Sequence, residues 1–344
     1  MEKMKVAMYY NNNDIRIEEM PVPEINDNEL LVRVQSSGIC GSDVMEWYRI
    51  KKAPRVLGHE ITGDIVEVGR NVKKYKVGDR VFVSHHVPCN NCKYCLNDQH
   101  TLCDTLHSTN FYPGGFAEYL KVPEINVDRG VFILPREMSY DEGVFIEPLA
   151  CVVRGMQIAR MKSGQNVLII GSGIAGLLHI KLVRTLDAGR VIVTDINDSR
   201  LQMAKKMGAD AAIHAKKNVP EQVRKHNNGK LADLVVLCAG VPSAVKQAIQ
   251  SVNRGGTILF FAPTEPGVDI PFPLFDLWNK GITMVSTYAG SPKDIAEAID
   301  LINLKKVNVK DMITHKLPLS ETAKGFKLVA EAKNSIKVVI EPQK

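Results

Sequence analysis

The sequence predicts a two-domain α/β protein, and three observations lead to this prediction. A chain of 344 residues is longer than one ordinary hydrophobic core accommodates. Its first 147 residues contain short alternating apolar segments, typical of strands joined by turns, at 30–34, 63–69 and 79–83. From 148 to about 290, apolar strands alternate with helical stretches, which indicates a parallel sheet covered on both faces.

The strands expected in this second region lie at 166–170, 190–194, 234–237, 257–261 and 282–285. The remaining tail has an amphipathic helix marked by Ile295, Ala298, Ile299 and Ile302, and it ends in a strand-like segment at 336–340. Because that segment has no obvious neighbour in the parallel region, we expect it to return to the β-rich domain. The expected domains are therefore 1–147 together with 291–344, and 148–290.

The composition is that of an ordinary globular protein, with 45% hydrophobic and 24% charged residues. The formal charge of +6 is spread along the chain, and no basic block indicates a nucleic-acid partner. No apolar run reaches the roughly 18–20 residues that span a membrane, and the first residues do not resemble a signal peptide. We expect a cytoplasmic protein that acts on a small molecule.

A glycine-rich turn predicts a dinucleotide site. The motif Gly171-Ser172-Gly173-Ile174-Ala175-Gly176 follows the first buried strand and opens a helical segment at 177–186. Gly171 permits a tight turn, Gly173 allows a pyrophosphate to approach the backbone, and Gly176 allows the helix to pack on the strand. The helix N-terminus then offers amide hydrogens to the phosphates.

Asp195 ends the second strand of this region, where a carboxylate accepts hydrogen bonds from the adenosine ribose. It would repel a 2′-phosphate, which favours NAD over NADP. Arg200 would flank the adenine or, alternatively, meet the extra phosphate of NADP. The plainer alternative is an ordinary acidic residue that caps a turn at the end of a strand.

Four closely spaced cysteines predict a structural zinc site: Cys89, Cys92, Cys95 and Cys103. Disulfides are disfavoured in a reducing compartment, whereas four thiolates close the tetrahedral coordination sphere of zinc. An iron–sulfur cluster uses related thiolate sets, but nothing nearby indicates an electron-transfer chain.

A second possible zinc set is dispersed along the chain: Cys40, His59, Glu60 and Glu147. Each residue alone is unremarkable, since a lone cysteine is usually a small buried residue and Glu147-Pro148 resembles a helix start. Together, a thiolate, an imidazole and a carboxylate give zinc three protein ligands and leave one exchangeable position. This donor set predicts a catalytic zinc, so we expect two zinc ions per chain.

These motifs together resemble the zinc-dependent medium-chain dehydrogenase family over essentially the whole chain. Cys40-Gly41-Ser42-Asp43 and Glu147-Pro148-Leu149 are similar to the branch that holds sorbitol, galactitol-phosphate and threonine dehydrogenases. The resemblance implies a GroES-like catalytic domain completed by the tail, a Rossmann domain inserted before it, and a homotetramer or, less often, a dimer. It also leaves open whether Glu60 and Glu147 each bind zinc directly, sit behind a zinc water or exchange with it.

The resemblance assigns Ser42 to proton transfer from the substrate hydroxyl, with Cys40 and His59 as zinc ligands. Trp47, His86 and Tyr288 are expected near the substrate, although His86 is equally well explained as a surface histidine of the cysteine lobe. Two positions depart from the family pattern. Met45 stands where many relatives carry the histidine that ends the proton relay, and Thr287 stands where sorbitol dehydrogenases have arginine before Tyr288.

The expected activity is hydride transfer between NAD and a secondary alcohol, and the expected substrate is a polyol or sugar alcohol, phosphorylated or not. Threonine-type amino-alcohol oxidation is the alternative that His86 favours. A zinc-lobe binding module is disfavoured, because no basic recognition helix follows the cysteines. A zinc-free quinone reductase is disfavoured by the presence of Cys40, His59 and the four-cysteine set.

Overall fold

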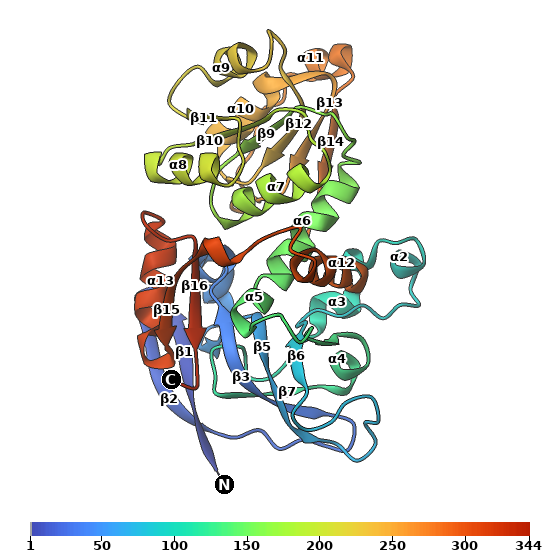
Figure 1. The fold of residues 1–344 in the computed structure, drawn as a ribbon, viewed down its shortest axis with the longest axis vertical. Helices are drawn as coiled ribbons and strands as arrows, with labels where there is room; N and C mark the ends of the chain where they lie inside the picture. The colour runs from blue at the N-terminus through green and yellow to red at the C-terminus, as the bar shows by residue number, and fades with distance from the viewer. Residues whose placement is uncertain (1) are drawn as a thin grey trace. The chain divides into compact units, whose positions relative to one another are not determined.

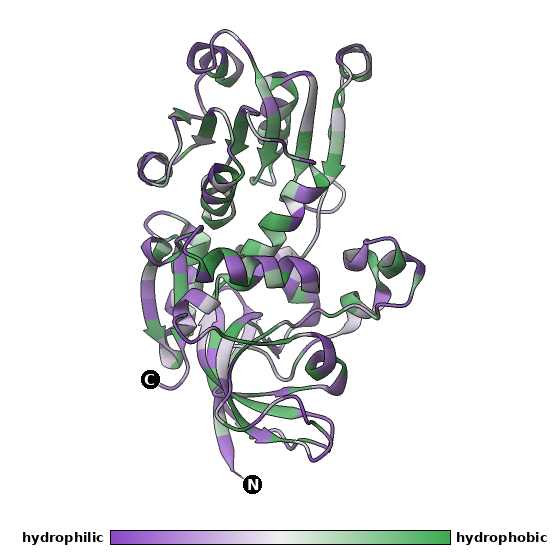
Figure 2. Cartoon of the chain, turned by 45° about the vertical axis from the view of Figure 1, so that its right-hand side comes forward, coloured by the Kyte–Doolittle hydropathy of each residue, from purple (hydrophilic) through white to green (hydrophobic). Residues whose placement is uncertain are grey.

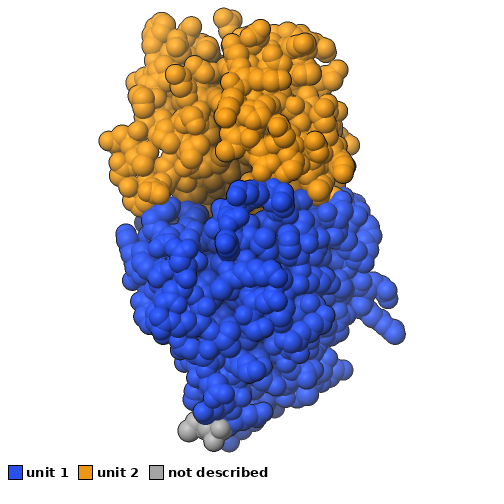
Figure 3. Space-filling view, turned by 90° about the vertical axis from the view of Figure 1, so that its left-hand side faces the viewer, with its two compact units in different colours: residues 1–150, 290–344 blue, residues 151–289 orange. Residues whose placement is uncertain are grey.

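The computed structural model describes residues 2–344, which form two compact units (Figures 1 and 3). The first unit contains residues 1–150 and 290–344, and the second contains residues 151–289. Helix α6 (Ile146–Ile158) begins in the first unit and ends in the second. The predicted α/β fold class with two domains is confirmed.

The first unit is built on two mainly antiparallel sheets. The smaller has the order β2-β1-β4 and the larger the order β15-β16-β3-β5-β6-β8, with β7 also paired to β3. The strands are β1 (Lys3–Asn11), β2 (Asp14–Pro21), β3 (Leu30–Gly38), β4 (Arg55–Val56), β5 (Glu60–Val68), β6 (Arg80–Val83), β7 (Tyr119–Val122), β8 (Val131–Ile133), β15 (Ile313–Pro318) and β16 (Lys337–Glu341).

Short helices connect these strands and cover them. They are η1 (Gly41–Val44), α1 (Glu46–Arg49), η2 (Ile50–Lys52), α2 (Lys93–Leu96), η3 (His100–Leu102), α3 (Asp104–Ser108), α4 (Glu124–Arg129), α5 (Tyr140–Gly143), α12 (Pro292–Asn303), η4 (Lys310–Met312), η5 (Leu319–Glu321) and α13 (Thr322–Glu331). One apolar core lies against β3, β5 and β6, and another packs α13 against β1 and β16.

The C-terminal tail joins the first unit through its last strand. β16 pairs in antiparallel register with the end of β3, with Val339 opposite Gly38 and Ile340 opposite Ser37. The expectation that the final apolar segment returns to the β-rich domain is confirmed. As a result, a strand some 300 residues away in sequence lies beside the loop that follows β3.

The second unit is a six-stranded parallel sheet in the order β11-β10-β9-β12-β13-β14. Its strands are β9 (Val167–Ile170), β10 (Val191–Asp195), β11 (Ala211–His214), β12 (Ala232–Leu237), β13 (Val252–Phe260) and β14 (Thr283–Ser286). Its helices are α7 (Ile174–Thr185), α8 (Asp198–Lys206), α9 (Val219–His226), α10 (Pro242–Ser251) and α11 (Leu274–Lys280). We did not predict β11 from the sequence, because it has only four residues and only every second residue is buried.

The central strands of this sheet are mostly hydrophobic (Figure 2). All residues of β9 and β10 are buried, as expected for parallel strands covered by helices on both faces. Among residues 2–344, no helix has both the length and the apolar character needed to cross a membrane.

Candidate functional site

The loop after β3 carries Cys40 and Ser42. The Ile39 amide donates to the Val338 carbonyl of β16, and the Cys40 amide donates to Oδ2 of Asp43, so the start of η1 is held from both sides. The Ser42 amide lies 3.4 Å from the Cys40 Sγ. The Cys40 side chain is therefore the N-cap of η1 and accepts a backbone hydrogen bond there.

The loop before β5 carries His59, and Glu60 is the first residue of the strand. Gly58 has a φ of +91°, and a Cβ there would lie 2.9 Å from the Phe116 amide nitrogen, so glycine is required. The His59 ring is 12% exposed, and its Nδ1 lies 3.4 Å from Oδ1 of the fully buried Asp43. Burial raises the pKa of Asp43, but the neighbouring His59 and Arg49 outweigh it and lower that pKa overall. Asp43 therefore fixes the orientation of the imidazole.

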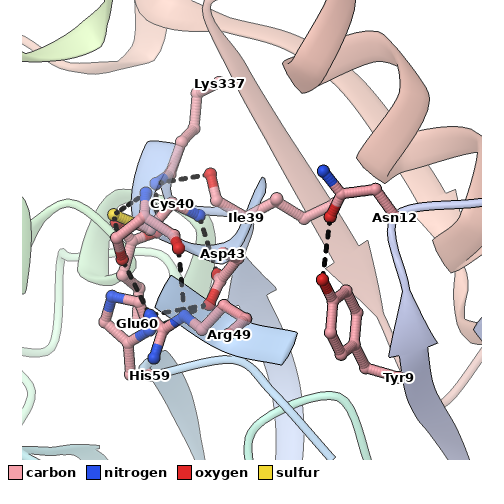
Figure 4. Close-up of polar contacts among 10 residues, drawn as sticks. Tyr9, Asn12, Ile39, Cys40, Asp43, Arg49, His59, Glu60 and Lys337 are labelled. Carbon is pink, nitrogen blue, oxygen red and sulfur yellow. Dashed lines mark hydrogen bonds and ion pairs between the residues drawn. The ribbon is translucent and has the colours of Figure 1, made fainter. Parts of the chain in front are cut away.

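Glu60 is paired with a lysine from the far end of the chain (Figure 4). Lys337, on β16, is fully buried and forms an ion pair with Oε2 of Glu60, which is itself 1% exposed. The lysine Nζ also lies 3.5 Å from the Ile39 carbonyl oxygen. The other oxygen of Glu60, Oε1, is buried and has no hydrogen-bond partner among residues 2–344.

Cys40, His59 and Glu60 form a compact set of metal ligands. One donor atom from each lies within 4.8 Å of the others. A thiolate, an imidazole and a carboxylate with an unused buried oxygen fit zinc. Glu147, on α6, is not part of this group. Its role toward the metal stays a prediction.

Ser42 is held by a residue that the sequence did not single out. Arg49 donates from its NH2 group to the Ser42 Oγ at 2.8 Å and from Nε to the Ser42 carbonyl oxygen at 3.0 Å. It also pairs with Asp43 at 3.3 Å. Met45 lies in the same turn, between η1 and α1. The hydroxyl that was expected to move a proton is thus bound to a permanently charged donor, which cannot itself accept a proton.

Two adjacent histidines lie beside His59. The His85 ring centroid is 4.9 Å from that of His59 and 3.8 Å from that of His86. Burial and the neighbouring His59 lower the pKa of His86 to about 3, and burial with His86 lowers the pKa of His85 well below its usual range. Both rings are therefore neutral near pH 7. Sequence reasoning named His86 but missed His85, which stands between His86 and the metal-ligand set.

The four cysteines of the lobe come together as expected from their spacing. The Cys95 Sγ lies 3.9 Å from that of Cys89 and 3.6 Å from that of Cys92, and the Cys89 amide donates to the Cys103 Sγ at 3.3 Å. All four are free thiols. Burial raises the pKa of Cys103, but amide hydrogen bonds outweigh it and lower that pKa to about 6. Four sulfurs with backbone donors fit a closed structural zinc site.

The glycine-rich turn of the second unit lies between β9 and α7, as predicted. Gly171 has a φ of +94°, which glycine adopts without strain. Gly173 is the N-cap of α7, which begins at Ile174 and continues through Ala175 and Gly176. A Cβ on Gly173 would lie 3.7 Å from the Arg200 guanidinium, and the Arg200 Nε has no partner among residues 2–344. The turn and this arginine therefore offer donors to an anion.

Asp195 has a local role that the sequence did not reveal. Its Oδ2 accepts hydrogen bonds from the Ser172 amide at 2.7 Å and the Ser172 hydroxyl at 2.9 Å. Its Oδ1 accepts one from the Asn197 amide at 2.9 Å. The carboxylate therefore braces the glycine-rich turn, and its Oδ1 has one further lone pair for a ribose hydroxyl.

Two residues expected near the substrate belong to different units. Trp47 lies on α1 with its ring 5.8 Å from that of Tyr48. Tyr288 follows β14 in the second unit and is 42% exposed. Their roles toward a substrate stay predictions.

The chain matches two family models and many known proteins. Residues 26–129 match the alcohol dehydrogenase GroES-like domain, and residues 175–303 match the zinc-binding dehydrogenase model. Sorbitol dehydrogenase of Bacillus subtilis is 32% identical over 356 residues, which covers 100% of this chain and 98% of that protein. Probable D-xylulose reductase A of Aspergillus clavatus is 34% identical over 345 residues, covering 95% of this chain and 94% of that one.

Solved structures agree with these matches. Galactitol-1-phosphate dehydrogenase from Escherichia coli superposes with a TM-score of 0.86 at 28% identity, covering 98% of this chain and 100% of that one. A protein from Sinorhizobium meliloti described as a zinc-binding dehydrogenase, bound to NADP, gives a TM-score of 0.88 at 27% identity, covering 99% and 100%. The chain is thus a zinc-binding dehydrogenase of the alcohol dehydrogenase type. It belongs to the zinc-dependent medium-chain dehydrogenase family, which joins a GroES-like domain to a Rossmann domain.

Proposed function

We propose that this enzyme oxidises a secondary alcohol of a polyol or sugar alcohol by hydride transfer to NAD. One observation carries the proposal. The donor atoms of Cys40, His59 and Glu60 lie within 4.8 Å of one another, and Ser42 is two residues from one of them. The similarity to proteins named sorbitol dehydrogenase and D-xylulose reductase supports a polyol as the substrate class.

Zinc held by these residues supplies Lewis acidity toward the substrate oxygen. Ser42 would accept the hydroxyl proton of the substrate as its own proton leaves to solvent water, and Arg49 keeps the serine oxygen in place and electrostatically favours negative charge beside it. Asp43 holds the His59 ring, and Lys337 holds one oxygen of Glu60. Glu147 remains a candidate as an exchangeable ligand.

We assign cofactor binding to the turn from Gly171 to Gly176, with Asp195 as the ribose acceptor. NAD is favoured because the Asp195 carboxylate would repel a 2′-phosphate. Arg200 favours NADP instead. Its guanidinium faces Gly173, and its Nε has no hydrogen-bond partner among residues 2–344, so it could bind the 2′-phosphate. The ratio of kcat/KM for NAD to that for NADP shows whether Asp195 or Arg200 determines the cofactor preference.

We also propose that the chain acts as a homo-oligomer, a tetramer or a dimer. β14 is an edge strand of the parallel sheet, and α11 exposes large apolar side chains beside its connection to β14. Leu274, Phe275 and Trp278 are each more than 70% exposed, which is unusual for a surface that stays in water. The same surface of a second copy of the chain would cover both the edge of β14 and the exposed apolar side chains of α11. Light scattering of Phe275→Glu should then show smaller particles than the wild type.

None of the seven cysteines forms a disulfide within residues 2–344, which favours a reducing compartment, so we place the enzyme in the cytoplasm. A second candidate activity is oxidation of an amino alcohol such as threonine, supported by the position of His86 near His59 through His85. NADH formation with polyols, sugar alcohol phosphates, threonine and simple alcohols separates these candidates. Polyol oxidation is wrong if threonine alone, or no alcohol at all, supports turnover by enzyme with two zinc ions per chain.

A further inference from the structure

The turn that carries Cys40 and Ser42 is too short to fix its own position. η1 has four residues and ends at Val44, and a helix of this length satisfies few of its backbone groups internally. Arg49 binds the hydroxyl and carbonyl oxygens of Ser42 in the middle of the turn. The carbonyl oxygen of Val44, at the end of the turn, is bound by a residue from a distant part of the sequence.

That residue is Asn12, at the tip of the N-terminal hairpin. Its Nδ2 donates to the Val44 carbonyl oxygen at 2.8 Å. Asn12 lies in the two-residue turn between β1 and β2, next to a shift in register between Tyr9 and Asn11. An irregularity of this kind redirects the side chains beside it. The hairpin of the smaller sheet therefore holds the loop that follows β3 of the larger sheet.

Tyr9 fixes the orientation of the Asn12 side chain (Figure 4). Its hydroxyl donates to Oδ1 of Asn12 at 3.0 Å, which leaves the NH2 end of the amide for the carbonyl of Val44. A flipped amide would place its oxygen against that carbonyl oxygen, and two acceptors form no hydrogen bond. Tyr9 is 1% exposed, and its ring centroid lies 5.9 Å from that of Phe326 on α13. The donor to Val44 is thus held by a residue of the core.

The next residue, Asn13, gives an internal comparison. It is exposed, and its amide donates to Oδ1 of Asn11 within the hairpin at 2.9 Å. Asn12 is half-buried, and its side-chain amide joins the core residue Tyr9 to the end of η1. Of these two neighbouring asparagines, only Asn12 therefore connects the hairpin to the turn that carries Ser42.

We propose that Asn12, oriented by Tyr9, is a positioning residue for alcohol oxidation. It holds the end of η1 and, through this single turn, the Ser42 hydroxyl two residues earlier. The inference rests on the proposed function, because it gives Asn12 a part in the same reaction. A displacement of about 1 Å in a reacting group can lower a rate about 10²-fold, so one hydrogen bond at the end of this turn is enough to affect turnover.

The test compares two variants of the same turn that carry the same change in charge. Asn12→Asp keeps the oxygen that faces Tyr9 and replaces the donor to Val44 by a second oxygen. Asn13→Asp adds the same charge at the exposed position. For the zinc-loaded enzyme with a polyol substrate, we expect Asn12→Asp to lower kcat about 10- to 100-fold and Asn13→Asp to change it less than about twofold. The KM for NAD should stay unchanged in both, because the glycine-rich turn belongs to the second unit.

Two further variants separate orientation from charge. Tyr9→Phe keeps the packed ring and removes the hydroxyl, so its kcat should fall between those of the wild type and Asn12→Asp. Asn12→Leu has neither a donor nor a charge, and it should reproduce the loss seen in Asn12→Asp. Each kcat refers to the folded fraction, which denaturant titration gives. A wild-type kcat in the folded fraction of Asn12→Leu overturns the proposal, even where that variant is less stable.

Hydrogen exchange keeps the inference separate from the proposed reaction. The amides of residues 42–45 should exchange about five- to tenfold faster in Asn12→Asp than in the wild type or Asn13→Asp, as expected for loss of one hydrogen bond. Faster exchange with an unchanged kcat overturns the proposal, because the bond would then hold the loop without serving the reaction. If the enzyme oxidises another alcohol and no polyol, the proposed substrate is wrong, and the same comparison of kcat with that alcohol decides the role of Asn12. Unchanged exchange and unchanged kcat in Asn12→Asp overturn the inference whatever the substrate is.

Discussion

The two clusters of metal ligands in the first unit are built in opposite ways. The four cysteines lie within fifteen residues, and their geometry depends on short turns and on backbone amides such as that of Cys89. Cys40, His59 and Glu60 come from two loops, and their geometry depends on Asp43, Arg49 and Lys337. The ligand geometry of the local cluster is set mainly by its own turns. The ligand geometry of the dispersed cluster depends on the complete fold of the unit around it.

The difference follows from what each site does. A closed four-thiolate site has no position for substrate and contributes to stability. A site with three protein donors leaves a position open, and its ligands must be oriented by neighbours that do not bind the metal. We therefore expect changes at the local cluster to affect folding, and changes at the dispersed cluster to affect turnover first.

The largest expected effect comes from His59→Ala. Loss of the imidazole should remove several kcal/mol of transition-state stabilisation, or about 10³-fold or more in turnover. Zinc content should fall from two per chain to one, while the far-UV circular dichroism stays unchanged. A variant that still binds two zinc ions and turns over normally would show that the dispersed cluster is not the catalytic centre.

The second-largest effect is expected for Lys337, the buried ion-pair partner of Glu60. Lys337→Met leaves Glu60 buried without its partner, which should lower the free energy of unfolding by about 3–5 kcal/mol. The matched control is Lys316→Met on β15, whose partner Asp141 forms a half-exposed pair worth about 1 kcal/mol or less. Denaturant titration gives both values.

A double variant separates charge from packing at this position. Glu60→Gln combined with Lys337→Met removes both charges, so it should recover part of the stability that Lys337→Met loses. Equal stability of the single and double variants would show that the lysine contributes through its packed methylene chain. Loss of catalytic zinc in the single variant would show that the pair also orients Glu60.

Cys103→Ser should affect the local cluster alone. Loss of one thiolate should cost about 3 kcal/mol of stability, or roughly 6–12 °C in the thermal midpoint. The protein that remains folded should keep one zinc ion and a KM for NAD close to that of the wild type. A variant with the wild-type midpoint but no turnover would reverse the roles that we assign to the two clusters.

The same contrast explains what the sequence could predict. The four-cysteine lobe, the glycine-rich turn and the return of the last strand were predictable, because each depends on spacing or on a run of apolar residues. The partners at the dispersed site were not. Lys337 gave one signal, a charge inside the otherwise apolar segment 336–340, which indicates a buried partner but does not identify it.

Arg49 and His85 gave no comparable signal. Arg49 reaches Ser42 because η1 and α1 fold back on one another, and no periodic pattern encodes that turn. His85 stands next to the predicted His86, but alternation of the chain alone does not tell which ring faces His59. Tertiary contacts, not local propensity, decide these positions.

The smallest expected effect concerns Met45, where the family resemblance led us to expect a histidine that ends a proton relay. The structure gives a physical reason why Met45→His should change the oxidation rate only slightly. Arg49 already occupies one acceptor site of the Ser42 hydroxyl at 2.8 Å, and a guanidinium does not accept protons. A histidine at 45 would therefore approach a serine whose position is already fixed and whose local charge is already positive.

We expect Met45→His to change the neutral-pH rate of alcohol oxidation less than about threefold, whereas Ser42→Ala should lose about 10²–10⁴-fold, as expected for a positioned proton acceptor. The measurement is the pH–rate profile under conditions where hydride transfer, rather than NADH release, limits turnover. A tenfold or greater gain in Met45→His at neutral pH would show that proton exit limits this enzyme and that Arg49 does not compensate for the missing imidazole. A harmless Ser42→Ala would instead remove Ser42 from the proton path, and the hydrogen bond from Arg49 would then serve the architecture of the loop alone.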